Sequence, residues 1–265
     1  MKRILTISLL LLTVILTVSA DRRRMLMTRN VASAAYSPSD TANLFAWYKS
    51  DALVTNTAGT SPPAANDSVA SWGDSSGNSR HVRTNLANAT APWFKGTAAT
   101  GKSYGGIENQ GAAMLSVGFT AQADSSIFFV WRNASAGVQK VIVDSTNSTS
   151  RHAIYKSATE KVSMYSASVI GSDINVVNPS WNIIAAVFNS AGSDALYTNG
   201  VAFTTAGNVG AGNLDGLALT SRYDGSTDRL STGEYLGEVV IYNRALNATE
   251  IGQVNTYLNS RWSAY

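Results

Sequence analysis

Residues 235–242 alternate between two faces with the two-residue period of a β-strand. One face carries Leu236, Glu238, Val240 and Tyr242, and the other carries Tyr235, Gly237, Val239 and Ile241. Both faces are mostly apolar. Strands of this kind are typical of the interior of a layered structure, so we expect this segment to lie inside a sheet and not at a solvated edge.

A short helix is predicted directly after this strand. Asn247 can accept a hydrogen bond at a helix N-terminus, and Glu250 is placed to complete a capping box with it. The apolar residues that follow at helical spacing are Ile251, Val254, Leu258 and Trp262. We therefore expect an amphipathic helix whose apolar stripe packs against a sheet.

Other apolar runs also favour strands. Residues 127–131 and 181–188 are short, β-prone and bounded by Ser, Asn or Gly, which predicts central strands. Asn199-Gly200, between two short apolar segments, is the sharpest signal for a two-residue hairpin turn. Beyond the first thirty residues, roughly 230 remain, which is enough for one domain with a sizeable core. An all-β domain over residues 31–265 is the resulting prediction.

Three segments, in this order along the chain, resemble motifs of the laminin-G-like jelly-roll domains of the concanavalin A-like superfamily. They are residues 43–52 (NLFAWYKSDA), residues 72–78 (WGDSSGN) with His81 after them, and residues 237–246 (GEVVIYNRAL) with Glu250 after them. The resemblance implies a two-sheet antiparallel jelly-roll sandwich with one short C-terminal helix. It implies less about function, because sites on such folds lie on loops that differ between members.

The middle motif also has a direct physical interpretation. The side chains of Asp74 and Ser76 can accept hydrogen bonds from nearby amides, while Gly77 and Asn78 tolerate left-handed backbone. Trp72 is expected to anchor this turn in the core.

The first thirty residues form a segment of different character. Lys2-Arg3, the apolar run 4–18 and Ser19-Ala20 have the three zones of a secretory signal that is cleaved after Ala20. The basic block Arg22-Arg23-Arg24 opposes translocation and favours an uncleaved anchor instead. A third interpretation is an arm that docks onto an assembly partner, as in a virion, or that supports a homo-oligomer.

Charge and cysteine content narrow the class of partner. The chain has 20 basic and 17 acidic residues, but residues 31–265 hold only 14 basic against 16 acidic residues. Nucleic-acid binding by the domain is therefore not expected, because phosphate contacts need a clustered positive face. The chain has no cysteine, so no disulfide framework is available and the core must supply the stability.

Two segments match catalytic motifs by spelling alone. Residues 96–103 (GTAATGKS) spell a phosphate-binding loop, but the Ser-Tyr-Gly-Gly that closes the segment cannot start the helix that such a loop requires. Residues 73–77 (GDSSG) spell a nucleophile elbow, yet they belong to the turn motif and not to a strand-to-helix link. Neither segment predicts an enzyme.

Laminarinase-like hydrolases share the jelly roll and carry two acidic residues close together on one face of a strand. Glu234 and Glu238 are the nearest approach, but along a strand they lie roughly 13 Å apart, beyond the separation that either hydrolytic route uses. Glu238 is expected to be hydrogen-bonded within the sheet. Asp215, Asp224 and Asp228 offer only weak support for calcium, and solvated turns explain them better, so no cofactor is predicted.

Sugar recognition combines an aromatic ring face with amide, carboxylate or guanidinium groups. The candidate residues for such a site are Trp93, Arg151, His152, Tyr155, Arg222, Tyr223 and Asp224. The favoured hypothesis is a non-catalytic carbohydrate-binding or adhesion module, secreted or held at a cell or particle surface, with a glycan or surface polysaccharide as partner. The alternatives are a structural virion protein, such as a fibre or head decoration, and a laminarinase-like glycoside hydrolase.

Overall fold

The computed structural model describes much of the chain beyond its N-terminal segment. The described residues are 35–52, 54–56, 60–84, 91–110, 113–116, 120–134, 136–176, 179–203, 207–224 and 228–265. The chain divides into two units, Met1–Tyr36 and Ser37–Tyr265, and the sheets belong to the second. The predicted signal, anchor or docking segment 1–30 lies outside the described residues. Among the helices that are described, none is long and apolar enough to cross a membrane.

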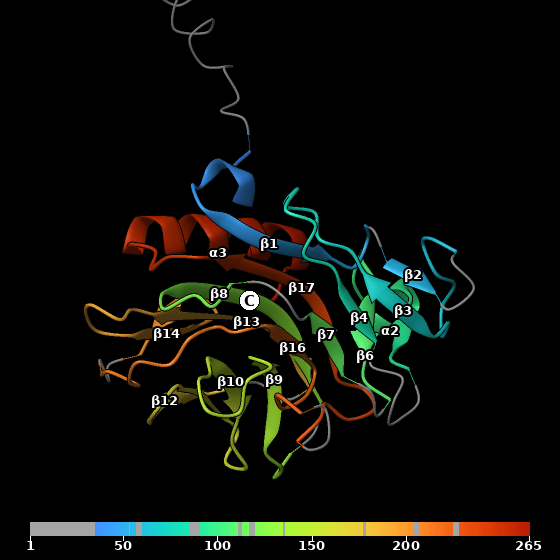
Figure 1. Ribbon diagram of the computed structural model, residues 1–265. Helices are drawn as coiled ribbons and strands as arrows, with labels where there is room; N and C mark the ends of the chain where they lie inside the picture. The colour runs from blue at the N-terminus through green and yellow to red at the C-terminus, as the bar shows by residue number, and fades with distance from the viewer. Residues whose placement is uncertain are drawn as a thin grey trace, which may run out of the picture. The chain divides into compact units, whose positions relative to one another are not determined.

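Two antiparallel sheets make up the second unit (Figure 1). Sheet A contains β1 (Leu44–Lys49), β5 (Trp93–Lys95), β6 (Gly106–Glu108), β8 (Ser125–Asn133), β13 (Ser180–Phe188), β14 (Ala195–Thr198), β15 (Val201–Ala202) and β17 (Tyr235–Tyr242). Its strand order is β15-β14-β13-β8-β17-β6-β5, and β1 also pairs with β17. The predicted central strands at 127–131 and 181–188 are confirmed as β8 and β13, which pair along their whole length.

Sheet B contains β2 (Val54–Asn56), β3 (Val69–Trp72), β4 (Val82–Thr84), β7 (Met114–Ser116), β9 (Lys140–Asp144), β10 (Ala153–Lys156), β11 (Lys161–Tyr165), β12 (Val169–Asn175) and β16 (Leu217–Leu219). Its order is β12-β11-β10-β9-β16-β7-β4-β3-β2. Among the described residues the sheets are accompanied by the 3-10 helix η1 (Pro38–Asp40), the four-residue α2 (Thr97–Thr100) and α3 (Ala248–Trp262). The prediction of an all-β sandwich with one short C-terminal helix is confirmed.

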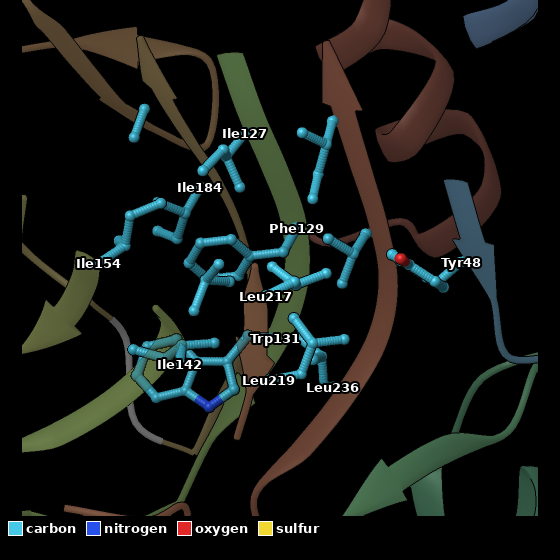
Figure 2. Close-up of a cluster of buried hydrophobic side chains, with 14 of the residues drawn as sticks. Tyr48, Ile127, Phe129, Trp131, Ile142, Ile154, Ile184, Leu217, Leu219 and Leu236 are labelled. Atoms are coloured by element: carbon cyan, nitrogen blue, oxygen red, sulfur yellow. The ribbon is translucent and has the colours of Figure 1, made fainter. Parts of the chain in front are cut away.

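The main core lies between the two sheets. Phe129 and Trp131 of β8 share this space with Leu217 and Leu219 of β16, as Figure 2 shows, and all four side chains are fully buried. Burial of aromatic and branched side chains supplies the main stabilisation of a domain without disulfides.

β17 departs from the regular alternation that its sequence predicts. The register with β8 shifts between Leu236 and Glu238, so Gly237 forms a bulge. Leu236 therefore joins Val239 in the core between the sheets, and Glu238 lies on the opposite face. The prediction that Leu236 and Glu238 share a face is wrong for this reason. A Cβ at Gly237 would lie 2.4 Å from the Trp262 ring, which explains the glycine.

Helix α3 packs on the outer face of sheet A, against β8 and β13 (Figure 1). The predicted capping box is present: Asn247 Oδ1 accepts from the Glu250 amide, and the Glu250 carboxylate accepts from the Asn247 amide. The predicted apolar stripe from Ile251 to Trp262 is buried. The Asn199-Gly200 hairpin is also confirmed, with both residues at positive φ between β14 and β15.

The turn motif at residues 72–78 forms the predicted core anchor and side-chain hydrogen bonds, and Gly77 has the expected left-handed backbone (φ 90°). The second left-handed residue is Ser79 (φ 59°) and not Asn78, so that part of the prediction is wrong. Trp72 is fully buried and its indole Nε1 donates to the Lys49 carbonyl. The Asp74 carboxylate accepts from the amides of Trp47, Ser76 and Arg80, so one buried carboxylate ties β1 to this turn.

Candidate functional site

The outer face of sheet B carries a small cavity of about 200 Å³. Its lining consists of Gln139, Val141, Arg151, Ala153, Tyr155, Tyr165, Arg222 and Asp228. The two-residue alternation of β10 explains why this face is available: Ile154 lies in the core between the sheets, so Ala153 and Tyr155 point outward. Two candidate segments far apart in the sequence, around Arg151 and Arg222, thus meet at one place.

Asp144, at the end of β9, organises this cavity. Its fully buried carboxylate accepts from Arg151 Nε at 3.0 Å, pairs with the second guanidinium nitrogen, and accepts from the Tyr223 amide at 2.9 Å. Burial raises the pKa of Asp144 to about 6, and Arg151 opposes that rise. One carboxylate therefore fixes both the guanidinium of Arg151 and the backbone of the loop that follows β16.

Rings and guanidinium groups alternate around Arg151. The Arg151 guanidinium lies 5.2 Å from the Tyr165 ring centre and 4.9 Å from that of Tyr223. The Arg222 guanidinium lies 5.0 Å from the same Tyr223 ring. These cation–π contacts hold the two tyrosine rings and two donor forks in a fixed relation to one another.

The remaining candidates lie elsewhere. Asp224 is exposed next to Tyr223 and is not part of the cavity lining. His152 is interior: its ring stacks on Phe188 at 3.9 Å, Ser125 Oγ lies 2.9 Å from Nδ1, and Nε2 lies 3.1 Å from the Gly212 carbonyl. Because a carbonyl can only accept, Nε2 carries the proton and the Ser125 hydroxyl donates to Nδ1. Trp93 belongs to β5 of sheet A, beneath the Lys95 ammonium.

A larger cavity of about 620 Å³ adjoins the first. Its lining consists of Asn109, Gln110, Val138, Gln139, Lys140, Asp228, Arg229, Leu230, Ser231 and Thr232. Gln139 and Asp228 line both cavities, so the two share a boundary. Neither Lys140 nor Tyr165 was predicted from the sequence to be a binding residue. The only available signal for Tyr165 was its outward position in an alternating strand.

The hydrolase and metal hypotheses gain nothing from the geometry. Glu238 is buried, and its carboxylate accepts from Trp47 Nε1, Tyr257 Oη, Arg261 Nε and Trp262 Nε1, so its partners come from β1 and α3. These donors occupy the oxygens that a catalytic acid or nucleophile would use. No cluster of His, Asp or Glu suited to a metal ion exists among the residues described, and Asp215 accepts from Asn147 Nδ2.

His152 gives the domain a defined response to acid. Burial lowers the pKa of His152 to about 4 from 6.5, so the unfolded chain takes up a proton first as pH falls. Neutral His152 therefore contributes to the free energy of unfolding in full above pH 6.5. This contribution falls by up to about 3 kcal/mol as the pH is lowered toward 4. We expect His152→Gln, which retains a donor and an acceptor, to remove this loss. Denaturant unfolding of both proteins at pH 7 and pH 4.5 measures the difference.

Asp144 provides a control for which the expected pH dependence of stability has the opposite sign. Its pKa is raised to about 6 from 3.8, so its contribution is complete below pH 3.8 and is lost as pH rises through 6. Asp144→Asn should therefore lose stability more steeply on acidification than the parent does. An identical pH dependence in the parent and His152→Gln would contradict the assignment of His152 as a buried neutral residue.

These features define a β-sandwich protein with a pocket on the outer face of one sheet. No family model matches the chain, and no curated protein sequence matches it. Solved structures do resemble it. The binding domain of Paraclostridial Mosquitocidal Protein 1 aligns with a TM-score of 0.56 at 17% identity, over 84% of this chain and 54% of that one.

Two further structures contain a bound sugar. The ligand binding domain of botulinum neurotoxin serotype D in complex with N-acetylneuraminic acid aligns with a TM-score of 0.56 at 12% identity, over 83% of this chain and 53% of that one. Domain 4 of AbnA, a GH43 extracellular arabinanase from Geobacillus stearothermophilus, in complex with arabinotriose, aligns with a TM-score of 0.53 at 15% identity, over 80% of this chain and 98% of that one. This chain spans about half the length of the toxin domains. At these identities the likeness establishes the β-sandwich fold and nothing further.

Proposed function

We propose that the protein is a non-catalytic carbohydrate-binding module and that the cavity around Arg151 is its sugar site. The observation that carries the proposal is the array of Tyr165, Arg151 and Arg222 in the cavity lining on the outer face of sheet B. The Tyr223 ring lies outside the lining and contacts both guanidinium groups, so it holds them in place. Ring faces suit the apolar side of a pyranose, and guanidinium groups donate to its hydroxyls. Gln139 and Asp228 add acceptors at the rim of the cavity.

The comparisons support this proposal at the level of the fold. A neurotoxin domain with N-acetylneuraminic acid and an arabinanase domain with arabinotriose share the sandwich. A sialidase from Trypanosoma rangeli also shares it, with a TM-score of 0.55 over 34% of that chain. The buried and fully bonded Glu238 favours binding without hydrolysis for this chain. We assign the sandwich to the laminin-G-like, concanavalin A-like domains on the motifs at residues 43–52, 72–78 and 237–246.

Surface display belongs to the same proposal. A secretory or anchoring segment at residues 1–30 would place the sandwich outside the cell or on a particle, where polysaccharides are met. The basic and apolar zones of that segment are the support for it.

The proposal is tested at Tyr223. Replacing Tyr223 by alanine removes a ring that two guanidinium groups contact, so we expect glycan binding to weaken by about 1–3 kcal/mol. Tyr223 is only partly buried, so the melting temperature should change little. The measurement is a glycan array with the full-length chain, followed by calorimetric titration of the best oligosaccharide.

Two control variants isolate the ring contribution. Tyr223→Phe keeps the ring face and should bind as the parent does. Tyr197→Ala removes a partly buried tyrosine of β14 in the other sheet and should leave affinity unchanged. The proposal is wrong if Tyr223→Ala binds normally, or if the parent binds no glycan on the array.

A further inference from the structure

The two adjoining cavities together offer more space than a single sugar needs. The smaller holds about 200 Å³ and the larger about 620 Å³, and Gln139 and Asp228 form the boundary that they share. A ligand lying in both must therefore extend over more than one ring. A chain of linked sugars has this form, with consecutive rings lying in neighbouring subsites.

The charge of the lining contrasts with that of the domain. Lys140, Arg222 and Arg229 line the cavities, whereas Asp228 is the acidic residue of both linings. Arg151 is also there, and its charge is balanced by Asp144. Residues 31–265 as a whole hold more acidic than basic residues, 16 against 14. A local excess of cationic side chains on an acidic domain favours an anionic ligand at that place. The rest of the domain surface, which carries a net negative charge, repels such a ligand.

The wall between the two cavities is held in place before any ligand arrives. Glu160 accepts from the Gly137 amide and from Asn133 Nδ2, and it pairs with the buried Lys156 ammonium at 3.0 Å. These contacts anchor the segment that carries Val138 and Gln139.

On the opposite side, the Asp228 carbonyl accepts from the Val141 amide at 2.7 Å, and the Leu230 amide donates to the Thr220 carbonyl at 3.1 Å. Both sides of the shared boundary are thus attached to sheet B. Preorganised walls reduce the entropy lost when a long ligand is ordered.

We propose that the two cavities form one extended site for an acidic oligosaccharide, with a sugar ring beside Tyr155 and Tyr165 and an anionic group facing Lys140 and Arg229. The inference rests on the proposed carbohydrate-binding function and specifies its substrate class. Carboxylate and sulfate groups share the required charge, and the guanidinium of Arg229 and the ammonium of Lys140 can donate to either.

The test compares matched acidic and neutral oligosaccharides on the full-length chain. The pairs are tetragalacturonate with its methyl ester, keratan sulfate tetrasaccharide with the desulfated form, and sialyllactose with lactose. We expect the acidic member of at least one pair to bind at least 10-fold more tightly than its partner at 150 mM salt. In the first two pairs the tetrasaccharide should also bind more tightly than its own disaccharide. The pair that shows the effect distinguishes carboxylate from sulfate recognition.

Variants locate the charge preference. Lys140→Gln and Arg229→Gln should each weaken binding of the acidic member by about 5- to 10-fold and leave the neutral member within twofold. Lys102→Gln, beside the C-terminus of α3, is the matched control and should change neither. Unfolding curves of each variant should overlay that of the parent.

The outcomes separate this inference from the function on which it rests. Equal affinity within every pair, with binding that Tyr223→Ala still weakens, overturns the acidic-ligand inference and leaves the carbohydrate site standing. A charge preference that survives both Lys140→Gln and Arg229→Gln also overturns it. If the protein binds none of the six oligosaccharides and no glycan on the array, both the acidic-ligand inference and the proposed carbohydrate-binding function are wrong.

Discussion

Glu238→Ala is expected to lower the free energy of unfolding by about 3–5 kcal/mol. The carboxylate is fully buried between sheet A and α3, where it accepts from Trp47, Tyr257, Arg261 and Trp262. Alanine would leave two buried indole N–H groups without an acceptor and the Arg261 guanidinium without its inner partner. Urea unfolding followed by tryptophan fluorescence measures the loss, since Trp47 and Trp262 report directly on this region.

A second carboxylate supplies the control for Glu238. Glu250 pairs with Arg244 and caps α3, but it is partly solvated, so Glu250→Ala should cost only about 1 kcal/mol. Glu238→Gln keeps the volume and one acceptor and should fall between the two alanine variants. If Glu238→Ala proved no worse than Glu250→Ala, the carboxylate would not be the group that joins helix to sheet.

Trp72→Ala is expected to cost a similar amount, about 3–5 kcal/mol, through a different mechanism. Trp72 is fully buried at the end of β3, its ring lies 5.8 Å from that of Tyr48, and its Nε1 donates to the Lys49 carbonyl. Removing the indole opens a cavity and removes one of the two donors to that carbonyl, the other being the Ala52 amide. Equilibrium denaturation with an unchanged m-value would show that the loss belongs to the folded state.

Trp93→Ala is the matched control for Trp72. Trp93 lies on β5, partly exposed beneath the Lys95 ammonium, so its removal creates a smaller cavity and should cost clearly less. Equal losses for the two tryptophans would mean that Trp72 is not the anchor of its turn. A loss under about 1 kcal/mol for Trp72→Ala would contradict its burial outright.

Local elements could be predicted where the residues that determine them lie close together in the sequence. The capping box of Asn247 and Glu250 and the Asn199-Gly200 turn each depend on residues within one turn of each other, and each is confirmed. The bulge at Gly237 could not be predicted in this way. It depends on the Trp262 ring, which approaches from the far end of α3 and leaves no room for a Cβ.

The candidate site could be predicted only in part, for the same physical reason. Arg151, Tyr155 and Arg222 were identified separately, but their meeting depends on the pairing of β9 with both β10 and β16, which is set by sheet topology. His152 could have been placed in the interior from the sequence. The alternation that directs Ile154 into the core directs His152 inward as well, with Tyr155 outward.

The place of β17 has a consequence for biosynthesis. β17 pairs with β8 along one edge and with β1 and β6 along the other, yet it is the last strand of the domain to be made. While the ribosome is still adding residues before 235, β1 lacks the one described strand with which it pairs, and β8 exposes one edge. Sheet A can therefore close only after residues 235–242 have been made, so these strand edges stay unpaired until that point in synthesis.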